Sequence, residues 1–205
     1  MGRRLGGDVG WALRPYIRRI GTYGISPPGM KPRSLHRRLA PAIVVPLLLT
    51  VVSGMAFRVG RSWFGLSADF GGWMMALHEG RYLGKQLVPF YVLFVGLALL
   101  AMIGSGLSLL RRRRLRSWHA WLAPLLAAPL LVSAVTGISF RLGKAWFDIP
   151  TPVARWLLRL HQGSYLGKDL RVVYVLLLGL GALALLGTGL GMTSLWRRRS
   201  AGLGG

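Results

Sequence analysis

Four long apolar stretches limit what this 205-residue chain can fold into more than any other feature of its sequence. Each reaches the roughly 20 residues that cross a hydrocarbon core as an α-helix. No acidic or basic side chain lies inside any of them, apart from residues at their edges. The stretches are Leu39–Phe57, Leu87–Leu110, Trp121–Phe140 and Val172–Trp196. The sequence therefore predicts an all-α integral membrane protein with a four-helix transmembrane bundle.

The basic residues gather on one predicted face of the membrane. A net charge of +22 is typical of nucleic-acid-binding proteins, but here the charge stands in three blocks outside the spans: the N-terminal segment up to Arg38, Arg111–Arg116 and Arg197–Arg199. With four spans these blocks share one face, which is the positive-inside pattern. We therefore expect a multi-pass protein of a bacterial inner (plasma) membrane or a thylakoid membrane, with both termini cytoplasmic. The expected contacts of the basic blocks are membrane lipids, and not nucleic acid.

Two absences in the sequence bear on how the chain is processed and on which cofactors it can hold. The first 30 residues contain no apolar core of a signal peptide, so we expect none. Cysteine is absent, which excludes disulfides, thiolate-held iron–sulfur clusters and thioether-attached haem. A cofactor must therefore be held by histidine or by non-covalent packing.

The sequence contains an internal duplication with a spacing of 83 residues and no gaps. Tyr82-Leu-Gly-Lys85 recurs unchanged as Tyr165-Leu-Gly-Lys168, and single positions such as Pro46 and Pro129 recur as well. Each repeat reads span, outer loop, span, so the halves have parallel orientation about a pseudo-two-fold axis along the membrane normal. The predicted segments are a basic cytoplasmic tail (1–34), a first two-span repeat (35–116), a second two-span repeat (117–199) and a flexible C-terminus (200–205).

Short interfacial helices are predicted in the two outer loops. In the second loop Thr151 is suited to the N-cap, Pro152 to the first helical position and Gly163 to the C-terminal cap. The first loop has an equivalent around Trp73–Glu79, with Gly72 near its start. Each of these helices ends on a histidine, which distinguishes them from ordinary surface helices.

All four histidines take part in the duplication, because His119 repeats His36 and His161 repeats His78. His36 and His119 open the first and third spans, whereas His78 and His161 lie beyond the far ends of those spans. A helix from His36 to Arg58 rises about 33 Å, so the histidines of one repeat cannot share a metal. Two imidazoles that face each other across the repeats are the usual axial ligands of haem iron. The sequence thus predicts two b-type haems per chain, with these four residues as the iron ligands.

Other interpretations of the same residues stay open. A membrane histidine can be an interface residue with a water or lipid partner, and two histidines leave the shell of zinc or copper incomplete. Arg58 and Arg141 either bind haem propionates or anchor the ends of the spans, and the same ambiguity holds for Tyr82, Tyr165, Lys85 and Lys168. Trp63, Trp73, Trp146 and Trp156 favour an aromatic belt. Glycines either make room for a porphyrin or allow close helix packing: Gly54, Gly104, Gly106, Gly137, Gly187 and Gly189.

Three short segments carry a family resemblance. They are Leu35-His36-Arg37-Arg38-Leu39-Ala40-Pro41, the span end from Thr50 to Gly54, and Leu77-His78-Glu79-Gly80 with Leu83-Gly84. This pattern resembles the PepSY-associated transmembrane family, and it occurs twice, over about residues 35–197. Members of that family include bacterial inner-membrane ferric-siderophore reductases, which carry haem between histidines of the bundle. The resemblance implies ligand roles for His36, His78, His119 and His161, and transmembrane electron transfer.

The chain also departs from the longer members of that family. Its outer loops are only about 30 residues each, which leaves no room for their large extracytoplasmic domain. It contains no Gly-rich dinucleotide fingerprint and no flavin domain. Substrate specificity and the source of electrons are therefore expected to belong to partner proteins.

Three functions compete on these observations. The first is electron transfer through two haems between a cytoplasmic-side donor and an acceptor across the membrane, for instance in ferric-chelate reduction with partners; as an enzyme the chain would be an oxidoreductase. The alternative is a non-enzymatic structural or assembly subunit of a larger membrane complex, such as a photosynthetic one, which the basic tail and compact size favour. The parallel repeat is the only feature that suggests a transporter. The absence of an acidic group at the midplane of the spans argues against that function.

Overall fold

The structure is a computed structural model that describes residues 32–110 and 118–191 of the chain. Within these two ranges all regular structure is helical and there is no strand. Several predictions fall wholly or largely outside them. These are the basic tail before residue 32, the basic blocks at 111–116 and 197–199, the end of the last span at Trp196 and the C-terminus at 200–205.

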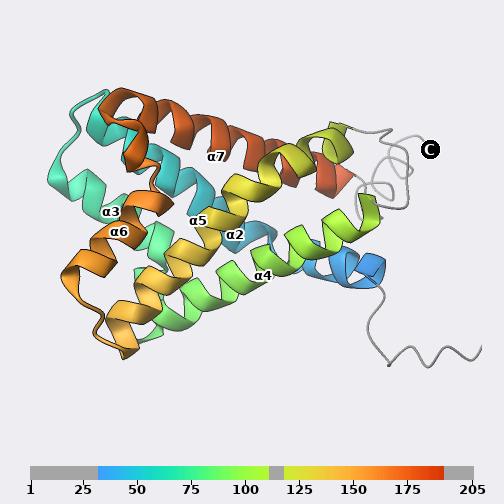
Figure 1. Ribbon diagram of the computed structural model, residues 1–205, viewed down its shortest axis with the longest axis horizontal. Helices are drawn as coiled ribbons and strands as arrows, with labels where there is room; N and C mark the ends of the chain where they lie inside the picture. Colours follow the sequence, from blue (N-terminus) through green and yellow to red (C-terminus); the bar gives the residue numbers. More distant parts are fainter. Residues whose placement is uncertain (1–31, 111–117, 192–205) are drawn as a thin grey trace, which may run out of the picture. The chain divides into compact units, whose positions relative to one another are not determined.

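Four long helices account for most of the described residues (Figure 1). They are α2 (Pro32–Ser62), α4 (Val88–Leu110), α5 (Trp118–Trp146) and α7 (Lys168–Gly191). Each is long and apolar enough to cross a membrane. The prediction of an all-α membrane bundle with four spans is therefore confirmed. Helices α2 and α5 each contain two prolines, which membrane helices tolerate because neighbouring groups satisfy the freed carbonyls.

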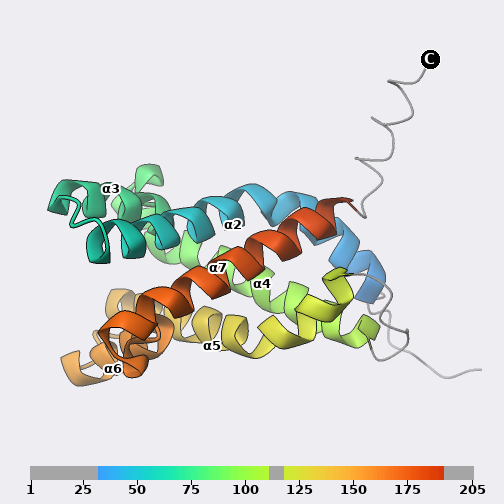
Figure 2. The same cartoon turned by 90° about the horizontal axis from the view of Figure 1, so that it is seen from above.

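The order of the helices around the bundle follows the duplication. Helix α2 packs against α4 and α7, and helix α5 packs against the same two neighbours (Figure 2). The helices that correspond in the two repeats, α2 with α5 and α4 with α7, therefore lie diagonally across the bundle. A pseudo-two-fold axis that runs along the bundle produces this arrangement, because it exchanges diagonal helices.

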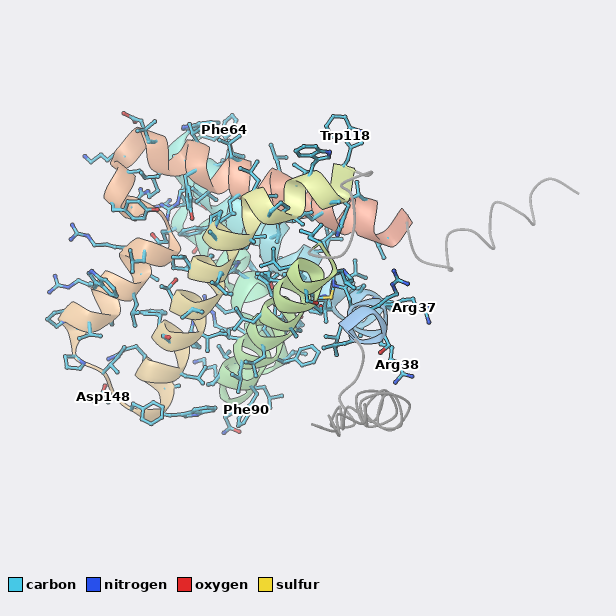
Figure 3. The ribbon with its side chains drawn as sticks, turned by 45° about the vertical axis from the view of Figure 1, so that its right-hand side comes forward. Arg37, Arg38, Phe64, Phe90, Trp118 and Asp148 are labelled. Atoms are coloured by element: carbon cyan, nitrogen blue, oxygen red, sulfur yellow. The ribbon has the colours of Figure 1, made fainter. Side chains whose placement is uncertain are left out.

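Apolar side chains occupy both the interior and the outside of the bundle. Ile43, Leu47 and Val95 belong to a buried cluster between α2 and α4. In contrast, Leu125 is 73% exposed and Leu177 is 64% exposed. Figure 3 shows further large apolar side chains, such as those of Phe64, Phe90 and Trp118, projecting away from the ribbon. A water-soluble bundle would carry polar residues there, so this surface is suited to lipid.

Two short helices, α3 (Ala68–Glu79) and α6 (Thr151–His161), lie at the same end of the bundle. Helix α3 packs on α2, and α6 packs on α5. They lead into the next long helices through the 3₁₀ turns η1 (Arg81–Leu83), η2 (Lys85–Leu87) and η3 (Ser164–Leu166). The first turn after each short helix, η1 or η3, is at the same position in both repeats, whereas η2 has no counterpart because α7 already begins at Lys168, the equivalent of Lys85.

The starts of both short helices differ from the prediction. Helix α3 begins at Ala68, before Trp73, because the side chain of Ser67 accepts a hydrogen bond from the Phe70 backbone N–H and caps the helix. Gly71 and Gly72 thus lie inside the helix. Helix α6 has Pro150 as its N-cap residue in place of Thr151. The predicted glycine cap of α6 is confirmed, since Gly163 follows its last turn with φ 67°.

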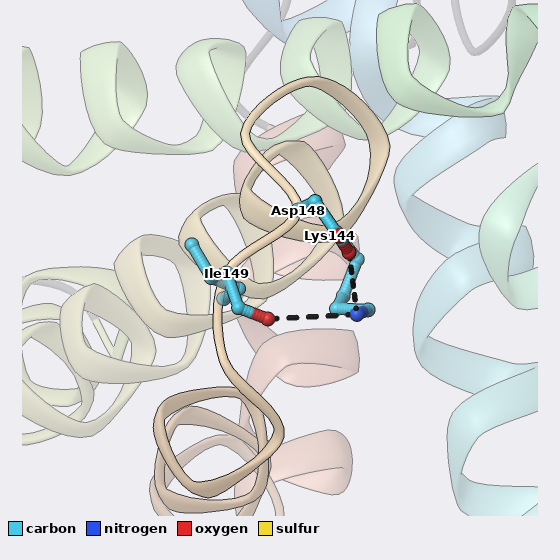
Figure 4. Close-up of polar contacts among 3 residues, drawn as sticks. All are labelled: Lys144, Asp148 and Ile149. Atoms are coloured by element: carbon cyan, nitrogen blue, oxygen red, sulfur yellow. Dashed lines mark hydrogen bonds and ion pairs between the residues drawn. The ribbon is translucent and has the colours of Figure 1, made fainter.

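The turn between α5 and α6 is closed by a basic side chain (Figure 4). Lys144 Nζ donates to Asp148 Oδ1 at 3.2 Å and to the carbonyl oxygen of Ile149 at 3.5 Å. The backbone N–H of Ile149 donates to the carbonyl oxygen of Gly143 at 3.1 Å. The first repeat has the same turn, in which Arg61 donates to the carbonyl oxygen of Leu66. These contacts fold α3 and α6 back toward the interior of the bundle.

Candidate functional site

The four histidines meet as two pairs. The ring centres of His36 on α2 and His119 on α5 are 6.3 Å apart, and the ring planes make an angle of 78°. The ring centres of His78 on α3 and His161 on α6 are 6.1 Å apart, with an angle of 64°. Each pair takes one residue from each repeat, which is the combination expected from the sequence.

His78 and His161 are held by backbone carbonyl groups of the long helices. His78 Nδ1 lies 2.7 Å from the carbonyl oxygen of Thr50, and His161 Nδ1 lies 2.8 Å from that of Ser133. A carbonyl oxygen can only accept, so Nδ1 of each ring is the donor. In the neutral imidazole, Nε2 then carries a free lone pair. A ring in this protonation state can bind a metal through Nε2.

Both of these histidines stay neutral at physiological pH. Desolvation lowers the pKa of His78; the bond to Thr50 opposes this effect and the charge of Arg141 adds to it. Desolvation also lowers the pKa of His161, to about 4, and a positive charge on His78 would act in the same direction. The two rings therefore offer unprotonated Nε2 atoms without competition from protons.

His36 and His119 are oriented by hydroxyl groups of α4 and α7. His36 Nδ1 lies 3.0 Å from Ser105 Oγ, and His119 Nδ1 lies 3.1 Å from Thr188 Oγ1. Ser105 donates its own proton to the Ala101 carbonyl at 2.6 Å, so its oxygen accepts from His36. Thr188 donates in the same way within α7. All four histidines thus have Nδ1 as donor, which makes Nε2 the unprotonated nitrogen of each neutral ring.

Glycine residues let the imidazoles approach the long helices. A methyl group at Gly54 would lie 2.9 Å from His78 Nδ1, and one at Gly137 would lie 2.9 Å from His161 Cε1. Gly54 is one helical turn after Thr50, so its missing side chain opens the path to the Thr50 carbonyl. A methyl group at Gly106 would lie 3.4 Å from His36 Cε1, and one at Gly189 would lie 3.4 Å from His119 Cε1. Gly104 and Gly187 have no such neighbour within 4 Å.

The distance within each pair matches ligation of one metal by both rings. A metal–imidazole bond is about 2.0 Å long, and a ring nitrogen lies about 1.1 Å from the ring centre, which puts the centres of two opposed ligands about 6.2 Å apart. The observed distances are 6.3 and 6.1 Å. In the described part of the chain no group of three His, Cys, Asp or Glu side chains could hold a metal ion. The residues therefore fit a metal that brings its own equatorial ligands, as in a tetrapyrrole.

A cavity adjoins each histidine pair. The cavity beside His36 and His119 has a volume of about 580 Å³, and the one beside His78 and His161 has a volume of about 240 Å³. Pockets for cofactors and drug-sized ligands span about 300–1,000 Å³. The larger cavity is within this range. The smaller one is below this range, and flexible side chains such as those of Met55 and Met75 are part of its wall.

Arg58 and Arg141 line the cavity at His78 and His161, and each is bonded to the opposite repeat. Arg58 Nη2 donates to Gln162 Oε1 at 2.7 Å. Arg141 forms an ion pair with Glu79, which also lies 3.3 Å from Arg81 Nε. Glu79 and Gln162 occupy equivalent positions, directly after the paired histidines. The two arginines therefore tie the end of each short helix to the other half of the bundle.

The remaining predicted residues lie away from both cavities. Tyr82 is 51% exposed and Tyr165 is 59% exposed. Neither they nor Lys85 and Lys168 are among the residues that line the two cavities. The four predicted belt residues are all exposed: Trp63, Trp73, Trp146 and Trp156.

Sequence reasoning missed the partners of the histidines. The oxygen acceptors come from Thr50 and Ser133 at one pair, and from Ser105 and Thr188 at the other. A usable signal was present for the second pair, because Ser105 and Thr188 keep a hydroxyl at the same position of each repeat; the backbone carbonyls of Thr50 and Ser133 leave no such signal in the sequence. No family model matches the chain, and neither a curated protein nor a solved structure matches it.

Proposed function

We propose that the protein is a dihaem b-type electron carrier of a membrane. His36 and His119 would hold one haem, and His78 and His161 the other. A bound haem supplies a one-electron ferric/ferrous couple. The observation that carries the proposal is the pair of symmetric sites in which one imidazole from each repeat lies opposite the other, with ring centres 6.3 and 6.1 Å apart, close to the spacing of two axial ligands.

The positions of the two sites suit electron transfer along the bundle. Helix α2 contacts both sites, since it carries His36 and also the Thr50 carbonyl that orients His78. Fourteen residues separate these two positions, which corresponds to about 21 Å along the helix. A hydrocarbon core is about 30 Å thick, so the two sites cover most of its depth.

The chain's own residues support binding and tuning rather than substrate chemistry. Neutral imidazoles and their oxygen acceptors would set the ligand orientation at each site, and Arg58 and Arg141 would add to the electrostatic field at the site of His78 and His161. The resemblance to the PepSY-associated transmembrane family favours the same function. Hydride chemistry and the reduction of a terminal acceptor, such as a ferric chelate, would belong to partner proteins.

The proposed orientation puts both termini on the cytoplasmic side of a bacterial inner membrane or on the equivalent side of a thylakoid membrane. Figure 3 shows Arg37 and Arg38 near the start of α2, at the end of the bundle away from Asp148. The basic end is retained on the cytoplasmic side in most membrane proteins. A reporter that is active only in the cytoplasm, fused to the C-terminus, should be active; inactivity would reverse the orientation.

The test of the function is the haem content of the protein purified in detergent. A pyridine haemochrome assay should give two b-type haems per chain. Alanine at His36 or His119 should remove one haem, and alanine at His78 or His161 should remove the other. A wild-type protein without haem would refute the function and favour the structural-subunit alternative. Loss of both haems from every single variant would refute the pairing.

Chemical rescue separates ligation from a role in folding. A glycine at His36 or His161 leaves space for a free imidazole, and added imidazole should restore the spectrum of the missing haem. The matched control is Trp156→Phe, which alters an exposed aromatic residue that lines neither cavity. This variant should keep both haems. Failure of imidazole to restore a haem in a folded glycine variant would count against ligation by that residue.

A further inference from the structure

The cavity at His78 and His161 has an asymmetry of charge that the duplication does not require. Arg141 is neutralised by the carboxylate of Glu79. At the equivalent position Arg58 meets the neutral amide of Gln162. Each arginine therefore bonds to the opposite repeat. The Arg141–Glu79 pair is neutral overall, whereas the Arg58–Gln162 pair carries a net positive charge.

Arg58 is a buried cation without a counterion. It is 8% exposed, and no carboxylate lies within 4.0 Å of it among the described residues. The guanidinium of Arg171 is close enough to repel it, and the Nε atom of Arg171 is itself buried without a hydrogen-bond partner. Val88 occupies the position equivalent to Arg171 in the first repeat, so this second charge occurs on one side only. Buried charges are normally paired, because their desolvation costs several kcal/mol.

We propose that Arg58, and not Arg141, binds a carboxylate of the ligand in this cavity. This inference rests on the proposed function, in which the carboxylate is a haem propionate. Arg58 lines the cavity and has five N–H donors, of which one is bonded to Gln162. A guanidinium binds a carboxylate through two parallel hydrogen bonds. Arg171 adds positive charge on the same side, whereas Glu79 would repel a carboxylate near Arg141.

Exchange of the two partners tests the proposal. Gln162→Glu gives Arg58 a carboxylate of its own, so the apoprotein should melt at a higher temperature. The same variant should release one of its two haems to apomyoglobin roughly tenfold faster than wild type, as expected for loss of one charged hydrogen-bonded contact. Glu79→Gln should lower the melting temperature without faster haem release. In the double variant Gln162→Glu with Glu79→Gln, Arg141 rather than Arg58 lacks a carboxylate partner within the protein. Its rate of haem release should therefore return toward the wild-type rate.

Gln162→Glu is expected to stabilise the apoprotein and yet to speed haem release. This combination distinguishes ligand binding by Arg58 from a purely structural role. If the Arg58–Gln162 contact only held the repeats together, Gln162→Glu would raise stability and slow haem release. The dimethyl ester of haem lacks free carboxylates, so wild type and Gln162→Glu should release it at equal rates. Unequal rates with the ester would overturn the proposal.

Three further outcomes separate the possible failures. A wild-type protein with two haems and a Gln162→Glu variant that releases them at the wild-type rate would overturn this inference alone. A wild-type protein without haem would overturn the proposed function and this inference with it. If acetate or inorganic phosphate raised the melting temperature of wild-type apoprotein but not of Gln162→Glu, and haem release were equal, Arg58 would bind a free anion, and the propionate assignment would be wrong.

Discussion

The contact between Gly54 and His78 gives the sharpest single test of the candidate site. An alanine at position 54 puts its methyl group 2.9 Å from Nδ1 and 3.0 Å from Cε1 of the imidazole. Carbon atoms in contact prefer separations of about 3.5–4.0 Å, so the ring must retreat by about half an ångström or more. That movement lengthens the hydrogen bond to the Thr50 carbonyl, which is 2.7 Å in the wild type.

The expected cost follows from the same geometry. Overpacking of a filled site costs about 1–3 kcal/mol. An open helical position gains about 1 kcal/mol from the change of glycine to alanine. Gly104 is such a position, since an added methyl group there has no neighbour within 4 Å. Both glycines lie inside helices, so this gain is common to the two variants and Gly54→Ala should be less stable than Gly104→Ala by about 1–3 kcal/mol.

Two measurements check this prediction. In thermal unfolding in detergent, the melting temperature of Gly54→Ala should be below that of wild type, and that of Gly104→Ala should be equal to or above it. The haem content of Gly54→Ala should fall toward one per chain, because a displaced His78 no longer directs Nε2 at the partner ring. Equal stability of the two variants, with both haems retained, would refute the idea that position 54 must lack a side chain for the imidazole to reach its acceptor.

Three further outcomes are expected. Ser105→Ala removes the acceptor of His36 Nδ1 and should weaken haem binding at that pair by about 10–100-fold in a titration, whereas Ser105→Thr, which copies the other repeat, should bind as wild type. The apoprotein should lose stability as the pH falls from about 6.5 to 4, because the lowered pKa of His161 makes the unfolded state take up the proton first; His161→Gln should flatten this part of the melting-temperature profile. Gly80→Ala should lower the melting temperature, since φ is 76° and the added methyl group would overlap the ring of Tyr91, whereas Gly72→Ala, with open space around the methyl group, should not.

The fold could be predicted because its main determinants are long and periodic. Uncharged stretches of membrane length fix the number of spans. The 83-residue spacing of His36 and His119 fixes which helices correspond, and so which residues face each other across the axis. Neither inference needs the position of a single side chain.

The details of the site could not be predicted because they depend on local geometry. The helix was predicted around Trp73–Glu79 with Gly72 near its start, but α3 begins earlier because the cap at Ser67 outweighs the low helix propensity of glycine. A hydroxyl such as that of Ser105 usually bonds within its own helix, and only the approach of His36 gives it a second role. Arg58 was expected at a ligand or at the membrane surface, yet its observed partner is a residue of the other repeat.

Both histidine pairs and both arginine contacts cross from one repeat to the other, which has a consequence for how such a chain arises. A single repeat holds one histidine of each pair, so it contains half of each site and neither one whole. Two copies of the first repeat, joined as an isologous dimer, would rebuild both pairs and would form two identical bridges between Arg58 and Glu79. Fusion into one chain removes the requirement for identical halves. Gln162 and Arg171 are differences that a symmetric dimer could not acquire on one side alone.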